Sequence, residues 1–186
     1  MPRLLIGLTG AAGAGKDTVA DMITSQTAKP SLLHRYAFAE PMKEAAKILM
    51  GWGDAHVHEE LKEVVDPLYG VSPRKVLQTL GTEWGRELIN PDLWLLRAER
   101  YLDSISKLSL DTIVVITDVR FDNEAEFIIH QGGVVIEVLR PNSTKQVLEH
   151  KSEGGVKDIY VRHTLNNDSG LIQLKLEVLR LMGALR

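Results

Sequence analysis

The fold of this chain is decided by one stretch near its N-terminus, Gly10-Ala11-Ala12-Gly13-Ala14-Gly15-Lys16-Asp17-Thr18, which follows the apolar run Leu4-Leu5-Ile6-Gly7-Leu8. The apolar run predicts a buried strand, and the residues from Lys16 onward predict a helix. Between them, small residues allow successive backbone N–H groups to turn inward around a phosphate, at which the positive end of the helix also points. Lys16 would then reach the β- and γ-phosphates of a nucleotide. Strand, glycine-rich loop and helix in this order predict a phosphate-binding loop.

One position departs from the usual pattern of such loops, G-x-x-x-x-G-K-[ST]. Asp17 occupies the place where a hydroxyl normally ligates Mg²⁺, and Thr18 follows one residue later. A carboxylate is also a hard oxygen ligand for Mg²⁺, directly or through a water. The metal role is therefore expected to stay with Asp17 or to be shared with Asp118. The alternative interpretation is a chance glycine- and alanine-rich turn in front of an amphipathic helix.

The composition is that of a globular chain that binds small anions through local groups. The chain has 186 residues, enough for one domain with a substantial core, which we expect to cover residues 1–186. Its net charge of -3 supplies no broad basic surface of the kind that a nucleic acid polymer needs. No apolar run reaches the ~18 residues of a membrane span, no signal peptide is expected before the first strand, and cysteine is absent. These features favour a cytoplasmic protein with neither a membrane nor a nucleic acid as partner.

Strand and helix patterns alternate along the chain, and this alternation predicts the fold class. A parallel sheet with helices on both faces follows from it, which is the three-layer α/β arrangement of a P-loop NTPase. Ser72 and Ser169 are expected to cap the helices that begin after them. The predicted strands cover 3–9, 32–38, 112–117, 134–139 and 160–165, and the predicted helices cover 16–27, 41–49, 73–88, 92–105, 123–130 and 171–185.

Two segments interrupt the simple alternation. Residues 40–108 contain more helix than a crossover between strands requires and are expected to form a helical substrate-binding insertion. Within them, residues 51–70 carry Trp52 and the cluster His56-Val57-His58-Glu59-Glu60, and we expect a mobile excursion rather than core. Histidine and glutamate can bind metals, but this spacing matches no known site and favours a solvated loop. Residues 141–158 are polar and are expected to form a short helical lid or flap.

Charged residues follow two of the predicted strands, at the sheet edge where parallel sheets bind ligands. Asp118 and Arg120 come after strand 112–117, and Arg140 comes after strand 134–139. A phosphate loop, a strand-end carboxylate and isolated arginines suit phosphoryl transfer, in which two charged phosphates are held close together. Asp118 is expected to bind Mg²⁺, the alternative being a cap of the following turn. Any one arginine can instead be a solvated surface group, and the candidates are Arg74, Arg86, Arg120, Arg140 and Arg162.

Further motifs along almost the whole chain resemble those of the bacteriophage deoxynucleoside monophosphate kinases. The most specific is Pro73-Arg74-Lys75-Val76-Leu77-Gln78-Thr79-Leu80-Gly81-Thr82-Glu83-Trp84-Gly85-Arg86. The loop ending Gly-Lys-Asp-Thr also matches, as do Phe38-Ala39-Glu40-Pro41-Met42-Lys43, Asp92-Leu93-Trp94, Asp118-Val119-Arg120-Phe121-Asp122-Asn123-Glu124, His150-Lys151-Ser152-Glu153 and Asn166-Asn167-Asp168. The resemblance implies phosphorylation of a deoxynucleoside 5′-monophosphate to the diphosphate, with ATP as donor and Mg²⁺ as cofactor.

The resemblance also implies roles for single residues. Arg120 would face the transferring phosphate, and Arg140 and Lys151 would belong to the flap. Together with Lys16 and Asp118, Arg120 and Arg140 are the expected catalytic residues. ATP would lie on the loop Gly10 to Thr18, with its adenine near Asn166 and Asn167. The monophosphate site would be bordered by Arg74, Arg86, Asp92 and Trp94.

The roles of Trp84 and Trp94 and the oligomeric state of the protein have alternatives that the sequence leaves open. Packing is the expected role of Trp84 and Trp94, and stacking on a substrate base is the alternative. A homodimer is compatible with the resemblance, and the host cytoplasm would be the location of a phage-encoded protein.

Other functions fit parts of the sequence. A kinase of another small acceptor, such as dephospho-coenzyme A, would share the loop but should lack the helix Gln78-Thr79-Leu80-Gly81-Thr82-Glu83. A non-catalytic guanine-nucleotide switch would need an Asn-Lys-x-Asp segment, which the sequence does not contain. An assembly ATPase usually carries larger accessory domains than 186 residues allow.

Overall fold

The computed structural model describes residues 2–26, 32–58, 60–109, 111–141 and 155–185, and the chain divides into two compact units. Unit 1 comprises Met1–Ala37 and Ala98–Arg186, and unit 2 comprises Phe38–Arg97. The single domain expected for residues 1–186 is thus composed of two compact parts. None of the helices in the described segments is both long and apolar enough to span a membrane.

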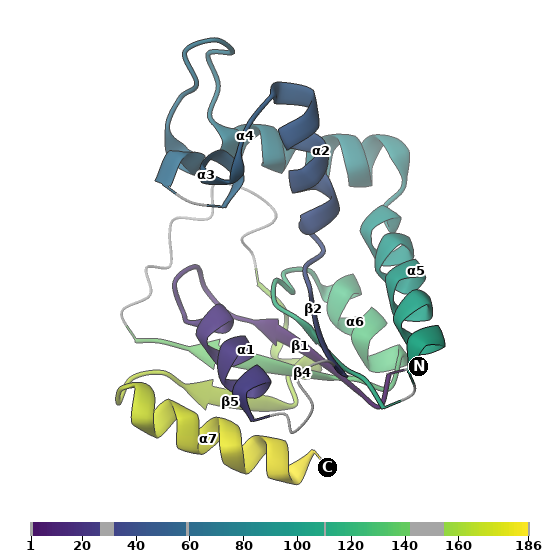
Figure 1. Cartoon of the computed structure of the whole chain (residues 1–186), viewed down its shortest axis with the longest axis vertical. Helices are drawn as coiled ribbons and strands as arrows, with labels where there is room; N and C mark the ends of the chain where they lie inside the picture. The colour runs from purple at the N-terminus through teal and green to yellow at the C-terminus, as the bar shows by residue number, and fades with distance from the viewer. Residues whose placement is uncertain (1, 27–31, 59, 110, 142–154, 186) are drawn as a thin grey trace. The chain divides into compact units, whose positions relative to one another are not determined.

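Unit 1 is built on a parallel sheet whose strands appear in the order β2-β3-β1-β4-β5 (Figure 1). The strand β1 is central, pairing with β3 on one side, where Leu5 faces Val114, and with β4 on the other, where Leu8 faces Ile136. These strands are apolar and buried because helices cover both faces of the sheet. Their bounds are β1 Leu4–Thr9, β2 Leu33–Tyr36, β3 Ile113–Ile116, β4 Val134–Leu139 and β5 His163–Asn166.

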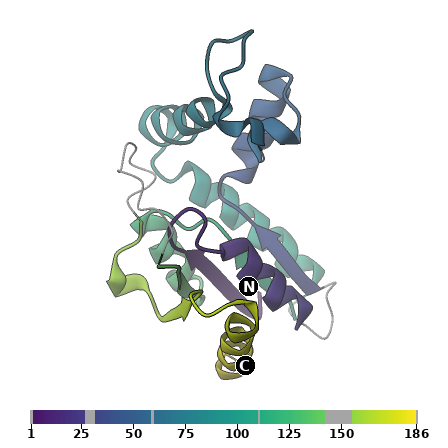
Figure 2. The same cartoon turned by 90° about the vertical axis from the view of Figure 1, so that its left-hand side faces the viewer.

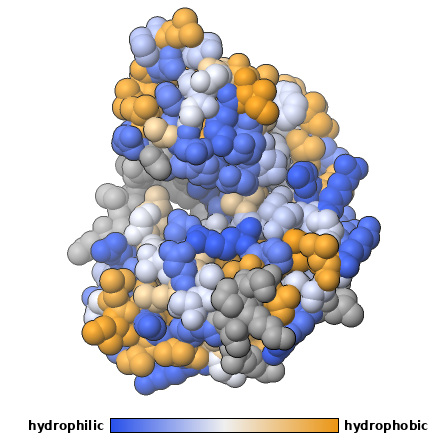
Figure 3. All heavy atoms as spheres, viewed as in Figure 1, coloured by the Kyte–Doolittle hydropathy of each residue, from blue (hydrophilic) through white to orange (hydrophobic). Residues whose placement is uncertain are grey.

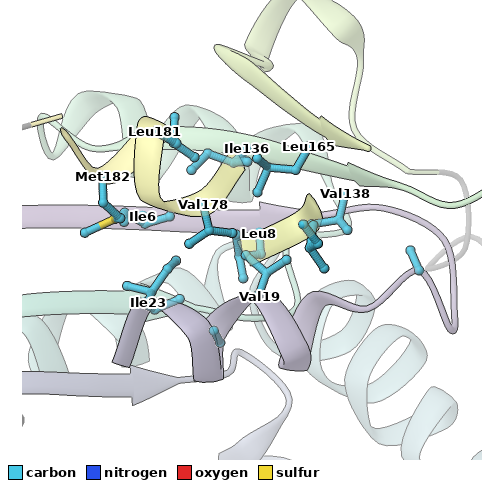
Figure 4. Close-up of a cluster of buried hydrophobic side chains, with 14 of the residues drawn as sticks. Ile6, Leu8, Val19, Ile23, Ile136, Val138, Leu165, Val178, Leu181 and Met182 are labelled. Atoms are coloured by element: carbon cyan, nitrogen blue, oxygen red, sulfur yellow. The ribbon is translucent and has the colours of Figure 1, made fainter. Parts of the chain in front are cut away.

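Helices form the outer layers of unit 1, as the α/β alternation predicts. The helices α1 (Lys16–Ser25) and α7 (Leu171–Ala184) pack side by side on one face of the sheet (Figure 1, Figure 2). The helix α6 (Asp122–His130) packs against β1 and β4. Figure 4 shows the core between α1, α7 and the sheet, to which β1 contributes Ile6 and Leu8. The fold class predicted from the sequence is confirmed.

The C-terminal part of unit 1 differs from the prediction in two details. The last strand begins at His163 rather than at residue 160, because Asp158–Tyr160 forms a 3₁₀ turn, η5. The cap predicted at Ser169 is wrong: α7 begins after Gly170 without a side-chain cap, and the Ser169 hydroxyl donates to Asp168 instead.

Figure 3 shows hydrophobic atoms gathered over α7, whose exposed apolar residues are Leu171, Ile172, Leu176 and Leu179.

Unit 2 is helical and has its own small core of Ala46, Trp52, Val57 and Leu77. Two of these residues lie in the segment 51–70, so the expectation of a mobile excursion without core residues is wrong. The Trp52 indole Nε1 donates to Asp66 Oδ2 at 2.7 Å, which closes the segment on itself. Its elements are α2 Glu40–Met50, α3 Asp54–Val57, η2 Glu60–Glu63, α4 Pro73–Gln78 and η3 Thr79–Ile89, followed by α5 Leu93–Leu108, which continues into unit 1.

The helix predicted for residues 73–88 changes type halfway. The Ser72 side chain accepts from the Lys75 N–H at the N-terminus of α4, so the predicted cap is confirmed. From Thr79 to Ile89 the chain forms a π-helix, in which N–H groups bond to carbonyls five residues back. Arg74 therefore lies on an α-helix and Arg86 on a π-helix. Such wide turns are rare in proteins, and those that occur are often found at functional sites.

Candidate active site

The loops that follow four strands of unit 1 lie at one edge of the sheet. All strand pairs are parallel, so the carboxyl ends of β1, β3, β4 and β5 point the same way. The phosphate loop follows the central strand β1, and its neighbours deliver Asp118, Arg120 and Arg140. This edge is where ligands bind in α/β sheets of this kind.

Glycine is required at two positions of the phosphate loop. Gly10 has φ 133°, and a Cβ there would lie 2.3 Å from the carbonyl oxygen of Val138. Gly15 has φ 102°, and a Cβ there would lie 2.5 Å from Asn167 Nδ2. Both backbone angles are accessible to glycine and costly for other residues. The loop can therefore approach β4 and the segment after β5 as closely as it does.

Lys16 lies within the electrostatic range of Arg120, Asp17 and Asp118. Its ammonium donates to the carbonyl oxygens of Gly10 at 2.7 Å and Ala11 at 2.9 Å. Burial lowers the pKa of Lys16 below 10.5, and the nearby Arg120 guanidinium lowers this pKa further, while the carboxylates of Asp17 and Asp118 oppose the shift. Lysine, arginine and two carboxylates from two loops therefore act on one point beside the phosphate loop.

Asp17 has a partner that the sequence does not reveal. Its carboxylate accepts from Arg35 Nη2 at 2.8 Å, and Arg35 Nη1 also donates to Asp21 at 2.5 Å. Arg35 lies on β2 and binds two carboxylates one helical turn apart on α1. The Asp17 side chain is 83% exposed, so the pair is open to solvent and exchangeable.

The backbone after β3 is held by the amides of three residues. The Thr117 N–H donates to the Tyr36 carbonyl, the Val119 N–H donates to the Leu8 carbonyl, and the Arg120 N–H donates to the Glu124 carboxylate. Asp118 is half-buried and Arg120 is exposed. The two charged side chains thus extend from a fixed backbone.

A hollow of about 830 Å³ adjoins the phosphate loop. Arg140 lines it and donates to the Gly13 carbonyl at 3.4 Å. Asn167 also lines it: its Nδ2 donates to the Ala14 carbonyl at 2.9 Å, and its N–H donates to the Leu139 carbonyl at 2.7 Å. The full lining is Ala12, Gly13, Gly15, Thr18, Arg140, Pro141, Asn167, Asp168, Gly170 and Leu171.

Of the two asparagines singled out in the sequence, Asn167 belongs to this lining and Asn166 does not. Asn166 is the last residue of β5, and its N–H donates to Glu177 of α7 at 3.1 Å. Successive strand residues face opposite sides, which accounts for the difference. Asp168 and Gly170 are lining residues that we did not predict, although Asp168 stands in the quoted turn motif.

The expected acceptor residues all lie in unit 2. Arg74 forms an ion pair with Glu63. Trp94 is buried and donates from Nε1 to the Gly81 carbonyl at 2.8 Å, so it packs against the π-helix. Arg86 is half-buried in η3, Asp92 is exposed, and Trp84 is 45% exposed. Lys151 and most of the predicted flap, residues 142–154, lie outside the described residues.

The histidine cluster of unit 2 is engaged in ion pairs and ring contacts. Among the described residues, Glu40, Glu44 and His58 are close enough to hold a metal ion. Lys43 contacts both Glu40 and the His58 ring, and Lys47 binds Glu44, so lysines already neutralise the carboxylates. His56 stacks on Trp52. The sequence interpretation of the cluster as a solvated loop without a metal stays a prediction.

The fold and this edge define a kinase of the phosphate-loop class: a parallel α/β sheet, a glycine-rich loop with its lysine, and a strand-end carboxylate and arginine that act on that lysine. The family model for deoxynucleotide monophosphate kinase matches residues 54–178. The chain belongs to this family.

The chain is similar to one named relative of this family and to two solved structures of other kinases. The chain is similar to the deoxynucleoside-5′-monophosphate kinase of Escherichia phage T5, with 30% identity over 94% of both chains. Among solved structures it is similar to dephospho-CoA kinase from Campylobacter jejuni, with 10% identity, a TM-score of 0.47, and 97% and 96% of the two chains covered. It is also similar to shikimate kinase from Bacteroides thetaiotaomicron, with 15% identity, a TM-score of 0.46 and 98% of both chains covered.

Proposed function

We propose that the protein transfers the γ-phosphoryl group of ATP to a deoxynucleoside 5′-monophosphate, forming the diphosphate and ADP. The observation that carries this proposal is the convergence of Lys16, Asp118 and Arg120 beside a phosphate loop that opens into a hollow of about 830 Å³. The name of the phage T5 relative supports the acceptor class.

The donor nucleotide is assigned to unit 1. Its phosphates bind the backbone N–H groups of residues 10–18, and Lys16 exchanges its two loop carbonyls for phosphate oxygens. The nucleoside occupies the hollow, where Asn167 and Asp168 offer polar groups to the base. A terminal phosphate oxygen of the acceptor attacks the γ-phosphorus, and the bond from that phosphorus to the β,γ-bridging oxygen breaks. Lys16 and Arg120 neutralise the charge on the transferring group.

Mg²⁺ fits the donor set of this edge. Asp118 and Asp17 are hard oxygen ligands within electrostatic reach of Lys16, and Asp118 would hold the ion directly or through water. Asp17 would join it by leaving Arg35. When bound, the ion neutralises charge on the β- and γ-phosphate oxygens.

The acceptor monophosphate is assigned to Arg74 and Arg86, with Asp92 and Trp94 bordering the site. A guanidinium meets two oxygens of a phosphate dianion at once, which a lysine cannot do. Arg74 would exchange Glu63 for the phosphate. Arg140 would remain on the donor side, where it lines the hollow.

A coupled ADP-release assay tests this function. ATP with Mg²⁺ is offered with a panel of ribo- and deoxymononucleotides, with dephospho-coenzyme A, and without acceptor. We expect ADP release that depends on a deoxymononucleotide, and Lys16→Ala should lower kcat by ~100-fold or more. Release only with dephospho-coenzyme A, or without any acceptor, would refute the proposal.

A homodimer, which the sequence leaves open, and the host cytoplasm as location stay predictions. Light scattering across a concentration series measures the first. Fractionation of infected cells measures the second, if the chain is phage-encoded.

A further inference from the structure

The Glu124 carboxylate is the one charged side chain that is buried among the residues the structure describes, with 1% of its surface exposed. Its Oε2 accepts two backbone N–H groups, from Arg120 at 2.7 Å and from Phe121 at 3.1 Å. Burying a carboxylate is costly unless hydrogen bonds compensate. Donors with partial positive charge at the N-terminus of α6 supply that compensation here.

These two bonds continue a series that holds the segment after β3. The N–H groups of Thr117 and Val119 bond to β2 and β1, at Tyr36 and Leu8. The next two amides, of Arg120 and Phe121, donate to the Glu124 carboxylate instead of to a strand carbonyl. The backbone of Arg120 is therefore fixed even though its side chain is exposed.

We propose that Glu124 is a positioning residue for phosphoryl transfer, which holds the Arg120 backbone so that the guanidinium is presented beside Lys16. This inference rests on the proposed function, because it takes the Arg120 guanidinium as a group that contacts the transferring phosphate. A donor that is fixed before the reaction needs no reorganisation when charge develops. Displacing such a group by about 1 Å can cost ~100-fold in rate.

A purely structural role is the competing explanation. The Glu124 carboxylate accepts the N–H of Phe121, the N-cap residue of α6, and this capping interaction contributes to helix stability whether or not Arg120 acts on a substrate. Both roles predict that a substitution lowers stability. They differ in whether the loss of rate depends on the Arg120 side chain.

A double-mutant cycle of Glu124→Gln and Arg120→Ala separates the two roles. Glutamine has nearly the same shape but lacks the charge, so we expect kcat to fall by ~10- to 100-fold with KM for ATP and for the monophosphate within ~3-fold of the parent. In the Arg120→Ala background, the same change at Glu124 should lower kcat by less than ~3-fold. An equal loss in both backgrounds, or a parent-like kcat in Arg120→Ala, would overturn the proposal.

Glu126→Gln is the matched control, because Glu126 lies on the same helix, is exposed and binds Tyr160 instead. It should leave kcat at the parent value. If Glu124→Gln does not fold, Glu124→Asp enters the same cycle, since it keeps the charge but shortens its reach.

Hydrogen exchange of the Arg120 and Phe121 amides provides a readout without turnover. Both amides should exchange faster in Glu124→Gln while the Val119 amide, held by β1, does not change. Unchanged exchange at Arg120 and Phe121 would refute the anchoring. A parent enzyme that phosphorylates no monophosphate would refute the proposed function instead, and the two failures are thereby distinguished.

Discussion

At the scale of single residues, burial of Lys16 disfavours the protonated form that phosphate binding needs. Burial and the Arg120 guanidinium disfavour its ammonium, and the loop carbonyls of Gly10 and Ala11 hold that ammonium when no phosphate does. A bound triphosphate would reverse this balance, because its negative charge favours the protonated form.

The first prediction is that ATP binding weakens as pH rises through the pKa of Lys16. Lys16 attracts the phosphates only in its protonated form. Because the pKa of Lys16 in the folded protein lies below 10.5, Lys16 loses its proton at a lower pH than an ordinary lysine does. We expect Kd for ATP to rise by ~10-fold or more across this window, the effect of one lost charged hydrogen bond. Calorimetric titrations from pH 7 to 10 measure it. Lys16→Met should bind weakly without that step, and parallel curves for the two proteins would contradict the assignment.

The second prediction concerns the two carboxylates near Lys16. Asp118→Ala should raise the Mg²⁺ concentration needed for half-maximal rate strongly, because it removes the carboxylate that follows β3. Asp17→Ser should stay partly active, because it restores the hydroxyl that most loops of this kind use. Metal titrations of both variants test this assignment, and curves that overlay the parent's would show it to be wrong. Arg35→Gln is the control, since it frees Asp17 without removing an oxygen ligand.

At the scale of elements, the π-helix η3 and the start of α5 are tightly packed against each other. Trp94 bonds to the Gly81 carbonyl, and its ring closes over Gly85. The sequence predicts a helix here, but the pattern of apolar positions that predicts it assumes α-helical spacing and does not reveal the π turns. Packing of Trp94 onto two glycines accompanies the wider turn.

The third prediction is that Gly85→Ala destabilises unit 2. A Cβ at Gly85 would lie 2.8 Å from Trp94 Cζ2 and 2.9 Å from the Leu80 carbonyl, so the helix or the indole must shift. Overpacking of this kind costs ~1–3 kcal/mol. Gly183→Ala is the matched control in α7, where nothing lies within 4 Å, and it should stabilise by ~0.5 kcal/mol. Urea denaturation followed by far-UV circular dichroism measures both, and equal effects of the two variants would contradict the packing argument.

At the scale of the whole molecule, the donor and acceptor assignments fall on different units. Residues expected to bind ATP belong to unit 1, and the arginines expected to bind the monophosphate belong to unit 2. Substitutions in one unit should therefore change the KM of one substrate and not the other.

The fourth prediction is that Arg74→Lys or Arg86→Lys raises KM for the deoxymononucleotide by ~10-fold or more and leaves KM for ATP little changed. The guanidinium fork binds two phosphate oxygens, and lysine replaces it with a point charge. Steady-state kinetics with each substrate varied in turn measures the effect. Glu63→Gln is the control for Arg74, because it removes the partner of Arg74 and should not raise the acceptor KM. An unchanged acceptor KM in both arginine variants would move the acceptor site away from these residues.

The phosphate loop, the parallel sheet and the placement of Asp118, Arg120 and Arg140 after strands could all be predicted from the amino-acid sequence alone. These features follow from local patterns: apolar runs at strand spacing, glycines in a turn, and charged residues directly after strands. Parallel topology then brings the strand ends together without further information. The family resemblance, carried by contiguous motifs, was confirmed for the same reason.

The side chains that hold these groups in place could not be predicted, because they come from elements that are distant in sequence. Arg35 binds Asp17 from β2, and Asn167 reaches the phosphate loop from the far end of the chain. Trp52 is buried because Asp66, fourteen residues further along, satisfies its N–H. Such contacts join residues that are distant in sequence, and their geometry depends on how whole elements pack. Periodicity describes one element at a time, so it carries no information about these partners.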